Sequence, residues 1–143
     1  MKFLFKIILP TVLVFLAGCT TTPNEMRAGV KEKGTMKFSI PFTIARHNFL
    51  AQAKNCFSRG LRTAYPVHVV NDVKPGEFTT LNIYLTGAPG MEMITHSFDI
   101  RKIESGETEV SWFIAGLIVV KHQPVVEYWV NGLEGRCGSI SDK

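Results

Sequence analysis

The sequence predicts an α+β fold in two layers: an antiparallel sheet of four to five strands, one long helix packed on it, and a short C-terminal helix. Three observations lead to this prediction. Several segments alternate apolar and polar residues, as half-buried strands do. One longer segment repeats its apolar residues at helical spacing instead. The strand segments follow one another through short turn sequences, which favours antiparallel pairing.

The first two elements begin after residue 34. Met36–Phe42 alternates apolar with polar residues and predicts a strand, in which Pro41 favours an edge or an end. A helix is predicted over Ile44–Arg59, with Thr43 as its N-cap and Gly60 as its C-cap. One face of this helix collects its apolar side chains, namely Phe49, Leu50, Ala53, Cys56 and Phe57.

Four further strands and a helix complete the prediction. The strand segments cover residues 67–73, 79–86, 91–103 and 109–115, and turns are expected at residues 74–76 and 104–107. The apolar stretch Trp112–Val120 is too short to span a membrane and is expected in the core. The last helix begins at Gln123-Pro124 and ends near Gly132.

The N-terminal segment has the layout of a secretory signal. Lys2 and Lys6 precede an apolar run that ends in Leu16-Ala17-Gly18-Cys19. Even counted from Phe3, the run covers about 15 residues, against roughly 20 in a spanning helix. The four-residue ending resembles the lipobox of bacterial lipoproteins.

The resemblance implies that residues 1–18 are removed and that Cys19 carries diacylglycerol on its sulfur and an acyl chain, such as palmitate, on its new N-terminus. Thr20 follows the cysteine where an Asp would favour the inner membrane, so the resemblance implies an outer-membrane anchor. Residues 19–33 are polar and without periodicity, and are predicted to be a flexible tether. Residues 34–143 form the single domain, which is expected in the periplasm.

Charge does not favour nucleic acid as a partner. The formal net charge of the chain is +4, and the first 18 residues carry two lysines and no acid, so the rest is only slightly basic. Its charged residues are interspersed, whereas a nucleic-acid surface needs clustered basic side chains. The expected partners are the membrane, through the acyl chains of Cys19, and an envelope protein.

Three cysteines occur in the chain, and the lipobox uses the first. Cys56 and Cys137 are left, and the oxidising periplasm favours a disulfide between them. Two free buried thiols are the alternative.

The sequence contains no motif that predicts catalysis. His47, His68, His96 and His122 lack metal-ligand spacing, so no metal or cofactor is expected. His96 shares its strand parity with the apolar residues Ile94, Phe98 and Ile100 and is expected on the inner face. It therefore points away from Ser97 and Asp99, which makes a poor triad.

Two tyrosines are candidates for a contact surface. Trp112 and Trp129 are expected in the core, which leaves Tyr84 and Tyr128 as the candidates. The order of elements is similar to that of helix-grip domains, an analogy of fold that does not imply function. The sequence thus favours a non-enzymatic, lipid-anchored envelope protein that acts through protein contacts. A module that binds a hydrophobic ligand or lipid is the alternative.

Overall fold

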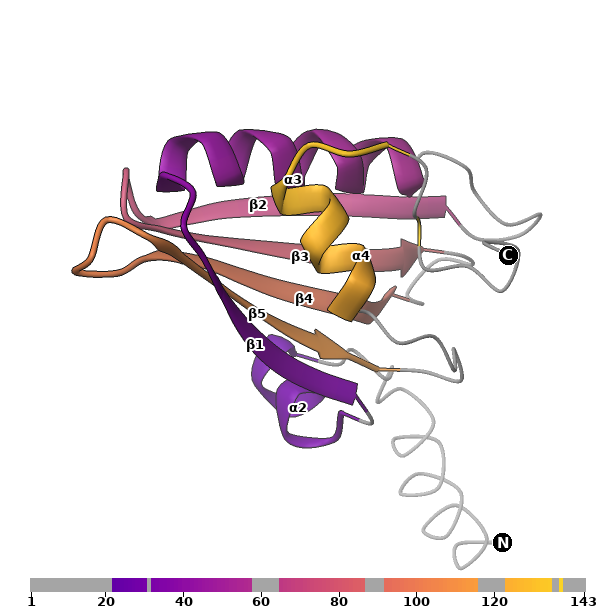
Figure 1. Ribbon diagram of the computed structural model, residues 1–143. Helices are drawn as coiled ribbons and strands as arrows, with labels where there is room; N and C mark the ends of the chain where they lie inside the picture. The colour runs from indigo at the N-terminus through magenta and orange to yellow at the C-terminus, as the bar shows by residue number, and fades with distance from the viewer. Residues whose placement is uncertain are drawn as a thin grey trace, which may run out of the picture.

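The computed structural model describes residues 22–30, 32–57, 65–86, 92–115, 123–134 and 137. It has the predicted α+β fold, with a five-stranded antiparallel sheet and helices on its faces (Figure 1). None of the helices in these ranges is long and apolar enough to cross a membrane. The elements, in order, are α2 (Pro23–Ala28), β1 (Glu32–Phe38), α3 (Phe42–Cys56), β2 (Tyr65–Lys74), β3 (Phe78–Thr86), β4 (Glu92–Lys102), β5 (Thr108–Ile114) and α4 (Gln123–Val130).

The strands lie in the order β1-β5-β4-β3-β2, so the two edges of the sheet are β1 and β2. Strands β2 to β5 are consecutive neighbours, and β1 pairs with the last of them. Helix α3 therefore carries the chain from one edge to the other. The turns before β3 and β5 contain Gly76 at φ 76° and Gly106 at φ 80°, a backbone conformation that only glycine adopts without strain.

The main core lies between the sheet and the pair α3 and α4. Its centre is an aromatic cluster of Phe49 from α3, Phe98 from β4 and Trp129 from α4, whose ring centroids are 5.1 to 5.7 Å apart. All three side chains are almost completely buried. The two pairs that include Phe49 are edge-to-face, and each such pair contributes about 0.5–1.5 kcal/mol beyond the area that it buries. The space between α3 and the sheet is therefore filled by side chains.

Strand β1 passes very close to the core. A Cβ atom at Gly34 would lie 2.1 Å from Cζ2 of Trp112, the residue that pairs with Gly34 on β5. The indole ring thus occupies the position that any side chain at residue 34 would need. Glycine is required here for close packing and not for an unusual backbone angle.

The prediction of a flexible tether over residues 19–33 is wrong for the part that the structure describes. Residues 23–28 form α2, and β1 begins at Glu32. A capping box starts the helix: Thr22 Oγ1 accepts from the Glu25 backbone N–H, and the Glu25 carboxylate accepts from the Thr22 backbone N–H. Pro23 then occupies the first helical position, where its missing N–H costs nothing.

Two details of the predicted elements are also corrected. Helix α3 begins at Phe42 with Pro41 as its N-cap residue, so Thr43 lies inside the helix and is not the cap. Ile94 does not share a face with Phe98, because the register between β3 and β4 shifts after the pair Ile83–His96. Ile94 pairs with Tyr84, on the face opposite the main core, and is nevertheless buried.

Candidate functional site

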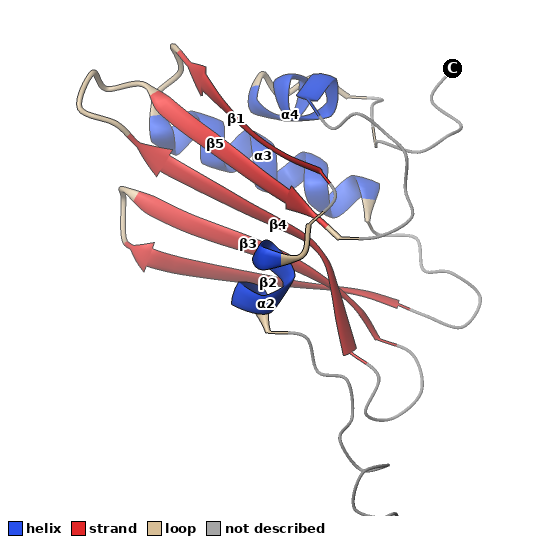
Figure 2. Cartoon of the chain, turned by 90° about the horizontal axis from the view of Figure 1, so that it is seen from below, coloured by secondary structure: helices blue, strands red, loops and turns tan. Residues whose placement is uncertain are grey.

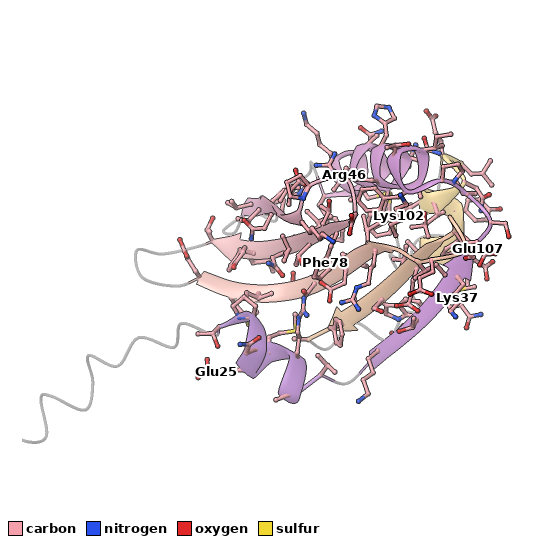
Figure 3. All side chains as sticks on the ribbon, turned by 90° about the vertical axis from the view of Figure 1, so that its left-hand side faces the viewer. Glu25, Lys37, Arg46, Phe78, Lys102 and Glu107 are labelled. Carbon is pink, nitrogen blue, oxygen red and sulfur yellow. A yellow bond between two sulfur atoms is a disulfide. The ribbon has the colours of Figure 1, made fainter. Side chains whose placement is uncertain are left out.

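The two faces of the sheet carry different helices. Helices α3 and α4 cover one face, and the short α2 lies on the other (Figure 2). Figure 3 shows Arg46 of α3 and Glu25 of α2 on opposite sides of the strands. We call the side of the sheet that carries α2 the α2 face.

Tyr84 and Tyr128, the predicted contact residues, lie on opposite faces. Tyr84 is on β3 and points away from the main core, because its neighbour Ile83 belongs to that core. Tyr128 is on α4 and packs partly against the core. The structure does not bring the two tyrosines together, so a single contact surface made of both is wrong. Trp112 and Trp129 are buried in the core, as predicted.

Strand β2 is an edge strand that exposes valines. Val67 and Val70 are each 42% exposed and Val73 is 60% exposed, and they are three of the six exposed large apolar side chains among the described residues. Edge strands present unpaired backbone N–H and C=O groups to a neighbouring chain. Pro66 near one end and a register irregularity between Asp72 and Lys74 near the other limit the regular part of this edge.

A hollow of about 300 Å³ opens beside β2 on the α2 face. Tyr84 and Val67 form a cross-strand pair in its wall, and Glu92 supplies a carboxylate. The other lining residues are Val69 and Thr86. The hollow thus combines apolar walls with one anionic group and two hydroxyls. Val67 lies on this face, whereas Val70 pairs with Leu81 of the main core and lies on the α3 side. We refer to the edge strand β2, with its exposed valines on both faces, and this hollow together as the β2 surface.

Arg27 binds α2 to the sheet. Its guanidinium donates to both carboxylate oxygens of Asp99 on β4, at 2.7 and 2.9 Å, and to Ser97 Oγ at 2.9 Å. The same group lies 4.7 Å from the ring centroid of Phe113 on β5. Thr80 Oγ1 also donates to Asp99, at 3.0 Å. Two-pronged pairing of this kind combines charge with a fixed geometry.

Sequence reasoning missed this arrangement. Arg27 and Asp99 are 72 positions apart, and nothing in either local pattern connects them. The helix itself could have been predicted, because Thr22-Pro23-Asn24-Glu25 has the sequence pattern of a capping box.

A second hollow, of about 330 Å³, lies at the C-terminal end of α3 and is lined by Lys54, Phe57, Pro66 and His68. Burial lowers the pKa of His68, and the positive charge of Lys54 adds to this, while a hydrogen bond with the Phe57 backbone opposes it. The imidazole is therefore neutral at pH 7, and Lys54 is the cationic group of this hollow.

His96 and Asp99 lie on opposite faces of the sheet. His96 is buried on the core side. Its Nδ1 lies 2.9 Å from Thr95 Oγ1, and its ring centroid lies 4.8 Å from the ring centroid of Phe57. Asp99 lies on the α2 face, held by Arg27. His47 is exposed on α3, and His122 lies outside the described residues. Within the described ranges, no group of three or more His, Cys, Asp or Glu side chains could hold a metal ion.

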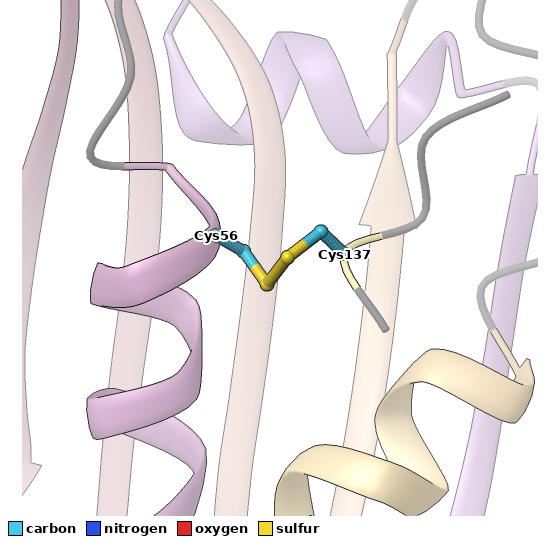
Figure 4. The surroundings of a disulfide bond; sticks show 2 residues. All are labelled: Cys56 and Cys137. Atoms are coloured by element: carbon cyan, nitrogen blue, oxygen red, sulfur yellow. A yellow bond between two sulfur atoms is a disulfide. The ribbon is translucent and has the colours of Figure 1, made fainter. Parts of the chain in front are cut away.

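The predicted disulfide is confirmed. Cys56, at the end of α3, is bonded to Cys137, which lies beyond α4 (Figure 4). The bond ties the long helix to the C-terminal part of the chain. Cys19 and the whole predicted signal segment lie outside the described residues.

No protein-family model matches this chain, and no curated protein or solved structure matches it either. Its class is therefore defined by its own architecture: a five-stranded antiparallel sheet with α3 and α4 on one face and α2 on the other.

Proposed function

We propose that this chain is a lipid-anchored protein of the cell envelope whose small domain acts without catalysis, through protein contacts made by the β2 surface. The anchor is the acylated Cys19, and the compartment is the periplasmic side of the outer membrane. The sequence Leu16-Ala17-Gly18-Cys19, at the end of a short apolar run, supports the anchor. Several acyl chains hold a protein firmly at a membrane, whereas one chain holds it only marginally.

The observation that carries the contact function is the exposed apolar edge at β2. Val67, Val70 and Val73 remain exposed on a strand whose outer side has no neighbour among the described residues. Long edges of this type pair with another chain unless they are protected. Within the described ranges, Pro66 and the irregularity before Lys74 protect the two ends of the strand.

The occupant that fits this surface is an extended segment of a partner envelope protein, added to the sheet as a further strand. Backbone hydrogen bonds to β2 would supply affinity. Alternate side chains of the segment would reach the hollow on the α2 face, where Val67, Val69 and Tyr84 favour an apolar group and Glu92 favours a basic one. The proposed partner sequence is therefore an apolar strand with a Lys or Arg.

The anchor is tested by metabolic labelling with an alkyne analogue of palmitate. We expect label on the wild-type chain and none on Cys19→Ser. Label that persists in Cys19→Ser, or a wild-type chain without label, would remove the anchor from the proposal.

The contact surface is tested by placing a photocrosslinking amino acid at position 70 in the anchored protein in cells. We expect one envelope protein to be captured from position 70 and not from position 44. Ile44 is a matched control because it is a large apolar residue, 53% exposed, on α3.

The same comparison applies to substitutions. Val70→Lys should abolish capture from a crosslinker at position 67, whereas Ile44→Lys should leave it unchanged. Equal capture in both variants would show that β2 is not the contact surface. Circular dichroism of both variants checks that each keeps its fold.

The hollow at the end of α3 favours the second candidate function, binding of a hydrophobic ligand. Phe57 and Pro66 supply an apolar lining and Lys54 a positive charge, which suits an anionic amphiphile such as a fatty acid. Native mass spectrometry of the purified protein tests this. A bound mass that is lost in Lys54→Glu would favour the ligand function, and an unliganded protein after incubation with oleate would exclude this ligand class.

A further inference from the structure

The chain between the predicted anchor and the folded domain is very short. Only Thr20 and Thr21 separate Cys19 from Thr22, the N-cap residue of α2. Three Cα–Cα steps span at most about 11 Å in a fully extended chain. The predicted tether of 15 residues would have reached several times further. The start of α2 is therefore confined to a narrow layer above whatever Cys19 is attached to.

The position of α2 on the domain is set by contacts that residues of its last turn make with the sheet. Met26 is buried, and Arg27 forms its two-pronged ion pair with Asp99 on the central strand β4. The guanidinium also lies over the ring of Phe113 on β5. These contacts join the helix to two neighbouring strands of the sheet. A limit on the position of Thr22 therefore also limits the position of the sheet.

The two faces of the sheet lie at different distances from this attachment point. Helix α2 is on one face, and α3 with α4 is on the other (Figures 1 and 2). Packed layers of secondary structure are separated by about 10 Å. The axis of α3 is therefore roughly 20 Å further from the attachment point than α2, measured across the sheet.

We infer that the α2 face of the domain lies against the bilayer surface and that the face formed by α3 and α4 points away from it. This inference rests on the proposed acylation of Cys19. The hollow at Tyr84 opens on the α2 face, so the partner segment enters from the layer next to the membrane. A partner that is itself embedded in or anchored to the same membrane fits this geometry.

The test uses acylated full-length protein in vesicles of phosphatidylethanolamine and phosphatidylglycerol, with a nitroxide on a fraction of the headgroups. A fluorescent amino acid is placed either at Asn24 on α2 or at His47 on α3, both of which are exposed. We expect quenching at position 24 to exceed quenching at position 47 at least about threefold, because contact with a nitroxide is short-ranged. Equal quenching, or stronger quenching at position 47, would overturn the inference.

Two variants separate this inference from the anchor itself. Ten Gly-Ser residues inserted between Thr21 and Thr22 keep the lipid but lengthen the connection, and should reduce quenching at position 24 to the level at position 47. Mass spectrometry of the acylated N-terminus is read on the same samples. A chain without acyl groups would refute the anchor, whereas an acylated chain without the difference in quenching would refute only the orientation.

Discussion

Removal of the disulfide is the perturbation whose size follows most directly from the structure. Cys56 and Cys137 are 81 positions apart, so their bond closes a loop that includes most of the sheet. The chain-entropy relation assigns a loop of that size about 4.5 kcal/mol at 25 °C. A domain of this size has a total stability of only about 5–15 kcal/mol. The double variant Cys56→Ala/Cys137→Ala should therefore lose a large part of its stability.

The expected change is measurable in two ways. An unfolding entropy of about 2.1 cal/mol/K per residue over about 110 residues converts this loss into a fall in Tm of roughly 20 °C. Urea unfolding, followed by circular dichroism, gives the free energy directly. Wild-type protein with its disulfide reduced should match the double variant, because both lack the same constraint.

The reasoning would be refuted by a double variant whose free energy of unfolding lies within about 1 kcal/mol of the wild type. That result would mean that the unfolded chain is already restricted over this loop, so the bond removes little further entropy. A change in the urea m-value would identify such residual structure.

Three further predictions concern single residues. Arg27→Ala should reduce the free energy of unfolding by about 2 kcal/mol, because it leaves the mostly buried Asp99 carboxylate without its cation. Gly34→Ala should cost about 1–3 kcal/mol and shift tryptophan fluorescence, because the new methyl group overlaps the Trp112 ring. The lowered pKa of His68 means that the unfolded chain binds more protons near pH 6, so stability should fall as the pH drops below about 6.5 and His68→Gln should flatten this slope.

Each of these has a matched control. Arg101→Ala removes an arginine that lies over the Phe78 ring and should cost less than about 1 kcal/mol, so an equal loss would contradict the role given to the Arg27 pair. Gly29→Ala is the control for Gly34, because its nearest atom would lie 3.7 Å away, an ordinary contact. For His68, urea titrations between pH 5 and 8 give the free energy of unfolding at each pH. A dependence on pH that is unchanged in the glutamine variant would contradict the pKa argument.

The acidic limit of stability has a separate origin. Hydrogen bonds from Thr79 and Arg46 lower the pKa of Asp72, and those from Ser105 and Ser39 lower the pKa of Glu107. Carboxyl groups with lowered pKa stabilise the fold above their unfolded values and lose this contribution as pH falls. Their effect therefore begins below about pH 4.5, outside the range in which His68 titrates.

Most elements could be predicted because their signals are local. The alternation through Leu81 and Ile83 and the apolar face through Phe49 and Ala53 follow from the geometry of a single strand or helix. Both sets of side chains are buried, as that geometry requires. The disulfide was predictable from the number of cysteines and the implied compartment, without knowledge of the distance between them.

The errors arose where local signals competed or were weak. Polar composition around α2 indicated a tether, but the capping box and the pairing of Arg27 with Asp99 stabilise a helix there. Strand parity placed Ile94 beside Phe98, but an irregular register reversed its direction. A register shift depends on the neighbouring strand and leaves no trace in the alternation of one strand.

By itself, the sequence determined the fold class, the apolar faces and the cysteine pair, because each depends on residue type and short-range periodicity; the anchor at Cys19 stays a prediction. Only the tertiary structure decided that Tyr84 and Tyr128 lie on opposite faces, that β2 is an edge strand of the sheet, and that a docked helix, α2, begins at Pro23, four residues after Cys19. These features depend on contacts between distant segments. The free energy of such contacts is set by strand order and register, which are properties of the whole fold.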